Sequence, residues 1–169
     1  NSGVVYGDIG SCYQHREGIF IEINKIRYTL DHAIVFNSIY KKNENTGISL
    51  LQHFKGWVIE TEMDVFDPGK ASLMDFRVHQ QHGTTFAYVL PFSPRSALVE
   101  YTLFTPNLLE PEQYDLELRN YISQFLQLTN YTILEQEFGV IPMTNEKFTI
   151  YHDGVFNIGT AGGQTKASS

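Results

Sequence analysis

The sequence TTFAYVLPFSPRSALVEYTLF, which occupies residues 84–104, decides the fold predicted for this chain. It contains two runs rich in aromatic and β-branched residues, Thr84–Phe92 and Ala97–Phe104, on either side of the turn residues Ser93 and Pro94. Such runs favour strands, and Ser and Pro favour the turn between them. The stretch therefore predicts a β-hairpin.

Further strands are predicted on both sides of this hairpin, over residues 52–62, 72–79 and 131–139. Turns such as Asp67-Pro68-Gly69 separate them. One helix is predicted over residues 111–128, because Pro111 suits a first helical turn. Its apolar residues repeat at helical spacing and should face the sheet; they are Leu118, Tyr121, Ile122 and Phe125.

Both ends of the chain differ from this middle part. Residues 3–36 predict a β-meander, in which the apolar run Ala33–Phe36 indicates a strand buried on both faces. Near the other end, Val155–Ile158 predicts a short buried strand that runs into Gly159-Thr160-Ala161-Gly162-Gly163. A glycine turn after a strand lets backbone N–H groups approach a ligand closely, but an ordinary tight turn has the same pattern. Neither end reads as a natural terminus, so we expect a fragment of a longer protein.

Composition excludes several classes of protein. The formal charge is −7 and no stripe of Lys and Arg occurs, so we expect no nucleic-acid partner. The single cysteine, Cys12, excludes an internal disulfide and a cysteine-based zinc site, and no His, Asp and Glu spacing predicts another metal site. No apolar run approaches the roughly 20 residues that a membrane-spanning helix needs.

Three charged residues stand inside apolar strand patterns. Glu100 lies in Leu98-Val99-Glu100-Tyr101-Thr102, and a covered carboxyl group there would have a raised pKa that suits an acid. Asp75 and Arg77 are two residues apart, so on a strand their side chains would point to one face. A solvent-facing Glu100 and a structural ion pair between Asp75 and Arg77 are the alternatives.

The sequence resembles the lycopene cyclases, which are flavin-dependent enzymes that form carotenoid rings. The resemblance runs from about Val35 to Ser169 and rests on ordered segments. Leu73–Arg77 looks like the family's Met-Asp-aromatic-Arg segment, and Thr84–Ser93 looks like its strand ending in Pro-Met/Phe-Ser. Leu98–Thr102 looks like its Phe-Leu-Glu-Glu-Thr motif. Gly139–Met143 looks like its Ile-Pro-Met segment, and Ile158–Gly162 with Ser168 looks like its C-terminal flavin turn.

The resemblance implies an α+β fold. An antiparallel substrate domain with one main helix would occupy residues 39–145. Partial segments of a Rossmann-like FAD-binding domain would lie on either side, at 1–38 as a β-meander and at 146–169 where the chain returns to that domain. The family's N-terminal glycine fingerprint is absent from these residues.

The resemblance also implies an activity, the closure of β-ionone rings at the ends of lycopene without net redox change. Glu100 would be the catalytic acid. Reduced FAD would be bound in part by Gly159, Thr160, Ala161, Gly162 and Gly163, with NADPH as the reductant. Aromatic residues would line a dry pocket that favours a carbocation, and Asp75 and Arg77 would shape it; the lining residues are Phe54, Trp57, Phe76, Phe86 and Tyr88.

The implied partners are lycopene and related carotenoids, and the implied protein is bacterial and cytoplasmic, in peripheral contact with the membrane. Two positions depart from the family pattern. Tyr101 replaces the second Glu of the acidic motif, and Val78 replaces an Asp after Arg77. A related flavoprotein, such as a geranylgeranyl reductase or flavin halogenase, and a non-catalytic module that binds a hydrophobic ligand are the alternatives.

Overall fold

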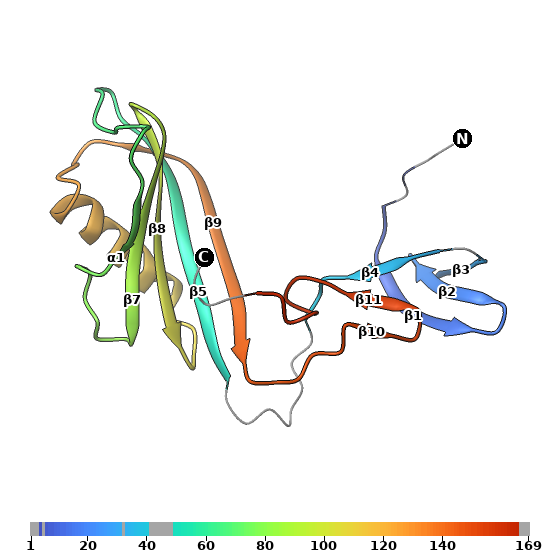
Figure 1. The fold of residues 1–169 in the computed structure, drawn as a ribbon. Helices are drawn as coiled ribbons and strands as arrows, with labels where there is room; N and C mark the ends of the chain where they lie inside the picture. The colour runs from blue at the N-terminus through green and yellow to red at the C-terminus, as the bar shows by residue number, and fades with distance from the viewer. Residues whose placement is uncertain (1–3, 5, 32, 41–48, 166–169) are drawn as a thin grey trace. The chain divides into compact units, whose positions relative to one another are not determined.

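The computed structural model describes residues 4, 6–31, 33–40 and 49–165. They form two compact units (Figure 1). The sheet unit spans Gly47–Asn145. The split unit combines Asn1–Thr46 with Glu146–Ser169, so the sheet unit is inserted between its two stretches.

The sheet unit is a five-stranded antiparallel sheet of order β6-β7-β8-β5-β9, with the helix α1 against one face (Figure 1). Its elements are β5 (Ser49–Glu60), β6 (Ser72–Asp75), β7 (Thr84–Ser93), β8 (Ser96–Thr105), α1 (Pro111–Gln124) and β9 (Thr132–Thr144). The hairpin predicted from residues 84–104 is confirmed as β7 and β8, with Tyr88 opposite Glu100. The antiparallel sheet with one helix is likewise confirmed.

The core of the sheet unit lies between the sheet and α1. Leu118, Tyr121 and Ile122 on the helix are fully buried, as predicted from their spacing. They pack on side chains from the facing side of the strands, which are Trp57, Ile59, Ala87, Val89, Ala97, Val99, Tyr101 and Leu103. Each large apolar side chain buried in this way contributes about 1.5–3 kcal/mol.

Several predicted boundaries in the sheet unit are wrong, including those of the strand predicted over residues 52–62, which spans Ser49–Glu60. The helix ends at Gln124 rather than residue 128, because Gln127 has a left-handed backbone with φ of 56°. Strand β6 ends at Asp75 rather than His79, after Met74 with φ of 52°. Strand β9 continues to Thr144, and it accommodates Pro142 because an edge strand can lack one backbone donor.

The split unit contains two small sheets. One is a meander of β1 (Ile9–His15), β2 (Gly18–Ile23) and β3 (Ile26–Leu30), so the meander predicted over residues 3–36 is confirmed except for its last strand, which belongs to the other sheet. The other has the order β10-β11-β4, in which β11 pairs in parallel with β4; the strands are β4 (Val35–Asn37), β10 (Tyr151–His152) and β11 (Val155–Asn157). The prediction that Ala33–Phe36 is buried on both faces is wrong, because Phe36 is 61% exposed.

Candidate active site

Glu100 lies on the face of the sheet that points away from α1, which we call the far face. Its strand neighbours Val99 and Tyr101 are fully buried in the core beneath the helix, and side chains alternate along a strand. Glu100 is paired across the strands with Tyr88 on β7 and Gly56 on β5. These three residues therefore share the far face.

The half-buried carboxyl group of Glu100 has an altered acidity. Burial raises its pKa from 4.5 to about 7, and the neighbouring Glu137 adds to the increase through a hydrogen bond and its charge. The Thr102 hydroxyl opposes the increase, since it donates a 2.5 Å hydrogen bond to Glu100 Oε1. Near neutral pH, a substantial share of this group is a protonated acid that can transfer a proton.

Aromatic rings surround Phe86 on the far face. Its ring centroid lies 5.5 Å from that of Phe76, 5.3 Å from that of Tyr88 and 6.0 Å from that of Phe104. Phe54 lies on the same face. It pairs with Thr102, which is two residues from Glu100 on β8 and therefore points to the same side as Glu100. Ring faces attract positive charge, so these residues and Glu100 form a surface suited to a cationic hydrocarbon.

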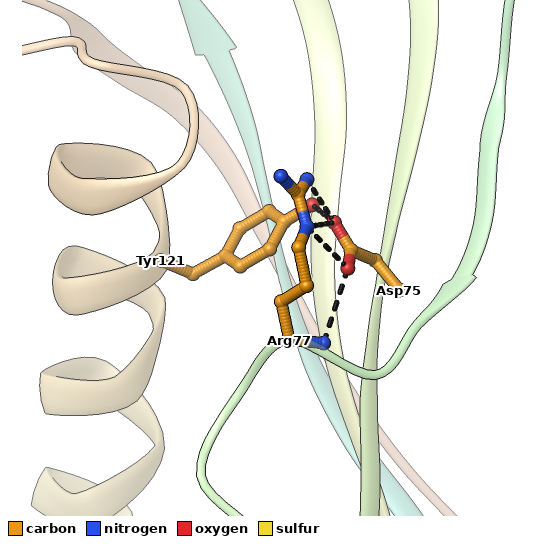
Figure 2. Close-up of polar contacts among 3 residues, drawn as sticks. All are labelled: Asp75, Arg77 and Tyr121. Carbon is orange, nitrogen blue, oxygen red and sulfur yellow. Dashed lines mark hydrogen bonds and ion pairs between the residues drawn. The ribbon is translucent and has the colours of Figure 1, made fainter.

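Asp75 and Arg77 do not lie with Glu100. Asp75 pairs with the core residue Ala87, and its Oδ2 accepts a 2.8 Å hydrogen bond from the Tyr121 hydroxyl of α1 (Figure 2). The Arg77 guanidinium contacts both carboxylate oxygens and lies 4.8 Å from the centroid of Phe125. The arrangement is the structural ion pair that the sequence left open, and it joins the turn after β6 to the helix.

Trp57 also lies away from Glu100. It pairs with Val99, is 1% exposed in the core, and lies beneath the Arg119 guanidinium at 5.5 Å from the ring centroid. Of the residues expected to line the pocket, the structure thus brings Phe54, Phe76, Phe86 and Tyr88 to the face of Glu100. It places Trp57, Asp75 and Arg77 on the helix face.

Glu137 is the site residue that sequence reasoning missed. It lies on β9 opposite Gly56, which places it on the far face beside Glu100, although 37 positions separate the two glutamates in the printed sequence. The sequence predicted a strand over residues 131–139 but singled out neither Glu135 nor Glu137, and both side chains are exposed in the structure. Strand order and register, which no local pattern contains, bring Glu137 to Glu100.

His53 is fully buried in the core, and the surrounding hydrogen bonds define its protonation. The Thr105 hydroxyl donates to the Asn107 carbonyl, so it accepts from His53 Nε2 at 2.7 Å. The Tyr114 hydroxyl therefore donates to Nδ1 at 2.6 Å. Desolvation lowers the pKa of His53, so this histidine is a neutral structural residue.

The glycine turn of the split unit is tightly folded. Gly159 and Gly163 have φ of 56° and 69°, and a Cβ on Gly162 would lie 2.4 Å from the Asn157 carbonyl oxygen. The Gly162 and Gly163 amides donate within the turn, and the Gly159 amide donates to Gln164 Oε1 at 3.0 Å. The turn requires glycine on geometric grounds alone.

Ala161 of this turn lines a cavity of about 640 Å³ in the split unit. Asn37 and Asn157 line it as well, and the Asn37 side-chain amide donates to Asn157 Oδ1 at 2.9 Å. Apolar walls come from residues that include Ile21, Val35 and Phe148. A cleft of this volume, with a few polar groups among apolar walls, is a candidate site for a ligand or cofactor.

Two negative findings concern the described residues. No helix among them is long and apolar enough to cross a membrane. In the same part of the chain, no group of three or more His, Cys, Asp and Glu side chains could hold a metal ion.

Solved structures with a similar fold are large enzymes or enzyme-like proteins. A geranylgeranyl bacteriochlorophyll reductase-like protein from Thermoplasma acidophilum matches with a TM-score of 0.59 and 12% identity, over 90% of this chain and 41% of that chain. The tetracycline destructase Tet(51) matches with a TM-score of 0.52 and 12% identity, over 91% and 44%. A triple mutant of the flavin-dependent brominase Bmp2 matches with a TM-score of 0.52 and 10% identity, over 92% and 44%.

The chain therefore shares its fold with parts of these proteins, one of which is described as flavin-dependent, and it spans about two fifths of their length. No curated protein matches it. The sequence model described as lycopene cyclase protein matches residues 39–169, which is more than half of the chain. The chain belongs to the lycopene cyclase family.

Proposed function

We propose that this chain is the substrate-binding part, with two flavin-side segments, of a lycopene β-cyclase. The whole enzyme converts the linear ends of lycopene into β-ionone rings. The observation that carries the proposal is the half-buried carboxyl group of Glu100 on an aromatic face of the sheet, with its pKa raised to about 7. Membership of the family supports the choice of carotenoid substrate.

In the proposed reaction, Glu100 donates its proton to the terminal double bond, and a cation forms in the hydrocarbon. The neighbouring alkene attacks the cation, which closes the ring. A base then removes a proton, so the product is an isomer of the substrate. General acid–base action of this kind is typically worth about 10²–10⁴ in rate.

Several residues around Glu100 on the far face have a task in the proposed reaction. Thr102 fixes the orientation of the Glu100 carboxyl group through its hydrogen bond to Oε1. Phe76 and Tyr88, which pack against the buried ring of Phe86, would face the positive charge of the intermediate. The transfer of an apolar carotenoid from a membrane to such a surface costs little free energy. We therefore expect the whole protein to be in peripheral contact with a membrane.

Reduced FAD, when bound, would stabilise the cation or relay the proton without net redox change. In this chain, Gly159–Gly163 and the cavity that Ala161 lines would hold part of the flavin. NADPH would be the source of the reducing electrons. Accordingly, residues 1–38 and 146–169 would belong to a Rossmann-like FAD-binding domain, and residues 39–145 would form the substrate domain.

The test uses the full-length protein that contains this chain, produced in bacterial cells that accumulate lycopene. We expect β-carotene from the wild type and uncyclised lycopene from Glu100→Gln, with bound flavin unchanged in the absorption spectrum. Glu135→Gln, an exposed residue on β9, is the matched control and should cyclise normally.

Normal ring formation by Glu100→Gln would contradict the role of Glu100. A wild type that leaves lycopene untouched but hydrogenates geranylgeranyl chains, or halogenates a substrate, would identify another flavoprotein activity. If the wild-type protein bound neither flavin nor a carotenoid product, it would be a module that binds another hydrophobic ligand and not an enzyme.

A further inference from the structure

We propose that Glu137 and Glu100 form a carboxyl–carboxylate pair that holds a single proton across Gly56, with Glu137 as the positioning residue of the catalytic acid. The pairing itself is a property of the sheet unit. Its role in ring closure rests on the proposed function.

Strand register brings the two glutamates together. Gly56 on the central strand β5 pairs with Glu100 on one side and with Glu137 on the other. Neighbouring strands lie about 4.8 Å apart, so the two glutamate backbones flank Gly56 at a separation of roughly 10 Å. Both side chains lie on the far face, and the proximity of Glu137 adds to the raised pKa of the Glu100 carboxyl group.

The absence of a side chain at Gly56 makes this contact possible. A Cβ at this position would lie 2.7 Å from Glu137 Oε1 and 2.9 Å from Glu137 Cγ. The Glu137 side chain therefore occupies the volume that any other residue would fill. The same arrangement occurs with the strands exchanged: the Phe54 ring of β5 lies over Gly139 of β9, and a Cβ at Gly139 would lie 2.3 Å from that ring.

The described strands around the pair carry no compensating cation on this face. The residues of β5, β7, β8 and β9 that share the far face include no Lys, Arg or His. The other titratable groups on these strands that face Glu100 are Tyr88 on β7 and Glu135 on β9, neither of which is a cation. Lys55 is on the opposite face, where it pairs with Asp115 of α1. Two adjacent carboxylates without a counterion repel, so one proton shared between them is the favoured state.

The second position of the family's acidic motif cannot supply this partner. Tyr101 occupies it here, and its side chain is fully buried on the helix face. Consecutive strand residues point to opposite faces, so a carboxylate at position 101 would also point away from Glu100. Glu137 provides the adjacent carboxyl group from a different strand.

The pair can both give and take the proton of the proposed reaction. Its single proton forms a new C–H bond at the terminal double bond and leaves a cation. The neighbouring alkene then forms the ring C–C bond. A C–H bond next to the new cation breaks, and its proton returns to the carboxylates, so the pair and the electron count are restored.

The first experiment measures proton affinity without flavin or lycopene. The 169-residue chain is labelled with ¹³C at glutamate side chains, the Glu100 carboxyl resonance is assigned by its loss in Glu100→Gln, and its titration is followed by NMR. We expect Glu137→Gln to lower the pKa of Glu100 by about 1, because the like charge is removed. The pKa should stay above its ordinary value, since burial is the main cause of the increase.

Two further variants complete this titration. Gly56→Ala keeps both glutamates but displaces the Glu137 carboxyl group, so it should lower the pKa of Glu100 in the same direction. Glu135→Gln, the matched control on the same strand and face, should leave it within about 0.3 of the wild-type value. An unchanged pKa of Glu100 in both Glu137→Gln and Gly56→Ala would overturn the pair.

The second experiment places the pair in the reaction. In the full-length enzyme, cyclisation requires the protonated form, so its rate falls as pH rises through the pKa of Glu100. Glu137→Gln should move this fall to lower pH by about the same amount as in the titration, and activity should be retained at the acid end. If the titration shows the pair but the full-length protein has no cyclase activity, only the proposed function is refuted. If the full-length protein cyclises lycopene and Glu137→Gln leaves its pH profile unchanged, only the role of Glu137 is refuted.

Discussion

The Tyr121 hydroxyl of α1 donates a 2.8 Å hydrogen bond to Asp75 Oδ2, the oxygen that also accepts from the Arg77 guanidinium at 2.5 Å. The contact connects the helix to the end of the edge strand β6. It explains why charged residues stand in an apolar stretch of sequence: they fix the helix on the sheet. The far face, which carries Glu100, lies on the other side of the sheet.

The first prediction concerns the effect of low pH on this connection. The guanidinium of Arg77, together with Tyr121, holds the pKa of Asp75 at about 2, against 3.8 ordinarily. A lowered pKa stabilises the fold above about pH 4, and the stabilisation is lost as pH falls through about 2. Because Arg77 is 61% exposed, we expect a loss of only about 1 kcal/mol in the free energy of unfolding.

Chemical denaturation between pH 2 and pH 6 measures this loss. Asp75→Asn should remove the acid dependence, and Tyr121→Phe should lower stability by about 1 kcal/mol at pH 6 through the lost hydrogen bond. Arg95, in an exposed ion pair with Asp64, offers the control Arg95→Gln, which should change stability very little. Equal acid dependence in the wild type and Asp75→Asn would contradict the assignment.

The second prediction concerns Glu100 and has the opposite sign. Its pKa is raised from 4.5 to about 7, so its contribution to stability is complete below pH 4.5 and is lost as pH rises through 7. We expect Glu100→Gln to gain about 2 kcal/mol relative to the wild type between pH 4 and pH 8. Denaturation at both pH values measures the gain, and a parallel pH dependence of the two proteins would show that Glu100 is not desolvated.

The third prediction concerns His53. Burial lowers its pKa from 6.5, so the fold loses stability as pH falls below 6.5 and the unfolded chain takes up a proton. The measurement belongs in the Glu100→Gln background, because Glu100 changes stability in the opposite direction over this range. Replacing His53 by Asn should flatten the dependence, whereas His79→Asn at an exposed position should preserve it.

The fourth prediction tests the packing of α1. Leu118 is fully buried against the sheet, so Leu118→Ala should cost about 3 kcal/mol in the free energy of unfolding. Leu116 on the same helix is 54% exposed, and Leu116→Ala is the matched control with a cost below about 1 kcal/mol. Similar losses in the two variants, measured by urea denaturation, would mean that α1 does not pack as described.

Local patterns predicted the elements that they specify directly. The hairpin follows from two apolar runs around Ser93-Pro94, and the buried side of α1 follows from the spacing of Leu118 and Tyr121. The far face could be predicted only in part. Alternation along the second run places Glu100 opposite in face to Val99 and Tyr101, but Tyr88 joins Glu100 only because the register of the hairpin shifts between Pro91 and Ser93.

The other residues of the far face and of the helix face are placed by long-range strand register and by backbone irregularities. The pairing of β6 with β7 shifts between Ser72 and Asp75, which turns Asp75 toward the helix. Glu137 reaches Glu100 only because β9 lies beside β5 and places it opposite Gly56. Neither relationship has a signal within a short window of sequence, so aromatic residues such as Trp57 could not be assigned to a face.

The parallel pairing of β4 with β11 imposes an order on events during synthesis. The bonded side chains of Asn37 and Asn157 are 120 residues apart, and a ribosome adding about 5–20 residues per second needs roughly 6–24 s to make the second after the first. Meanwhile Ser49 and Thr144 pair at the two ends of the sheet unit, which can therefore complete its own contacts. We expect the nascent sheet unit to fold first, while β4 remains unpaired and leaves Phe36 exposed to chaperones.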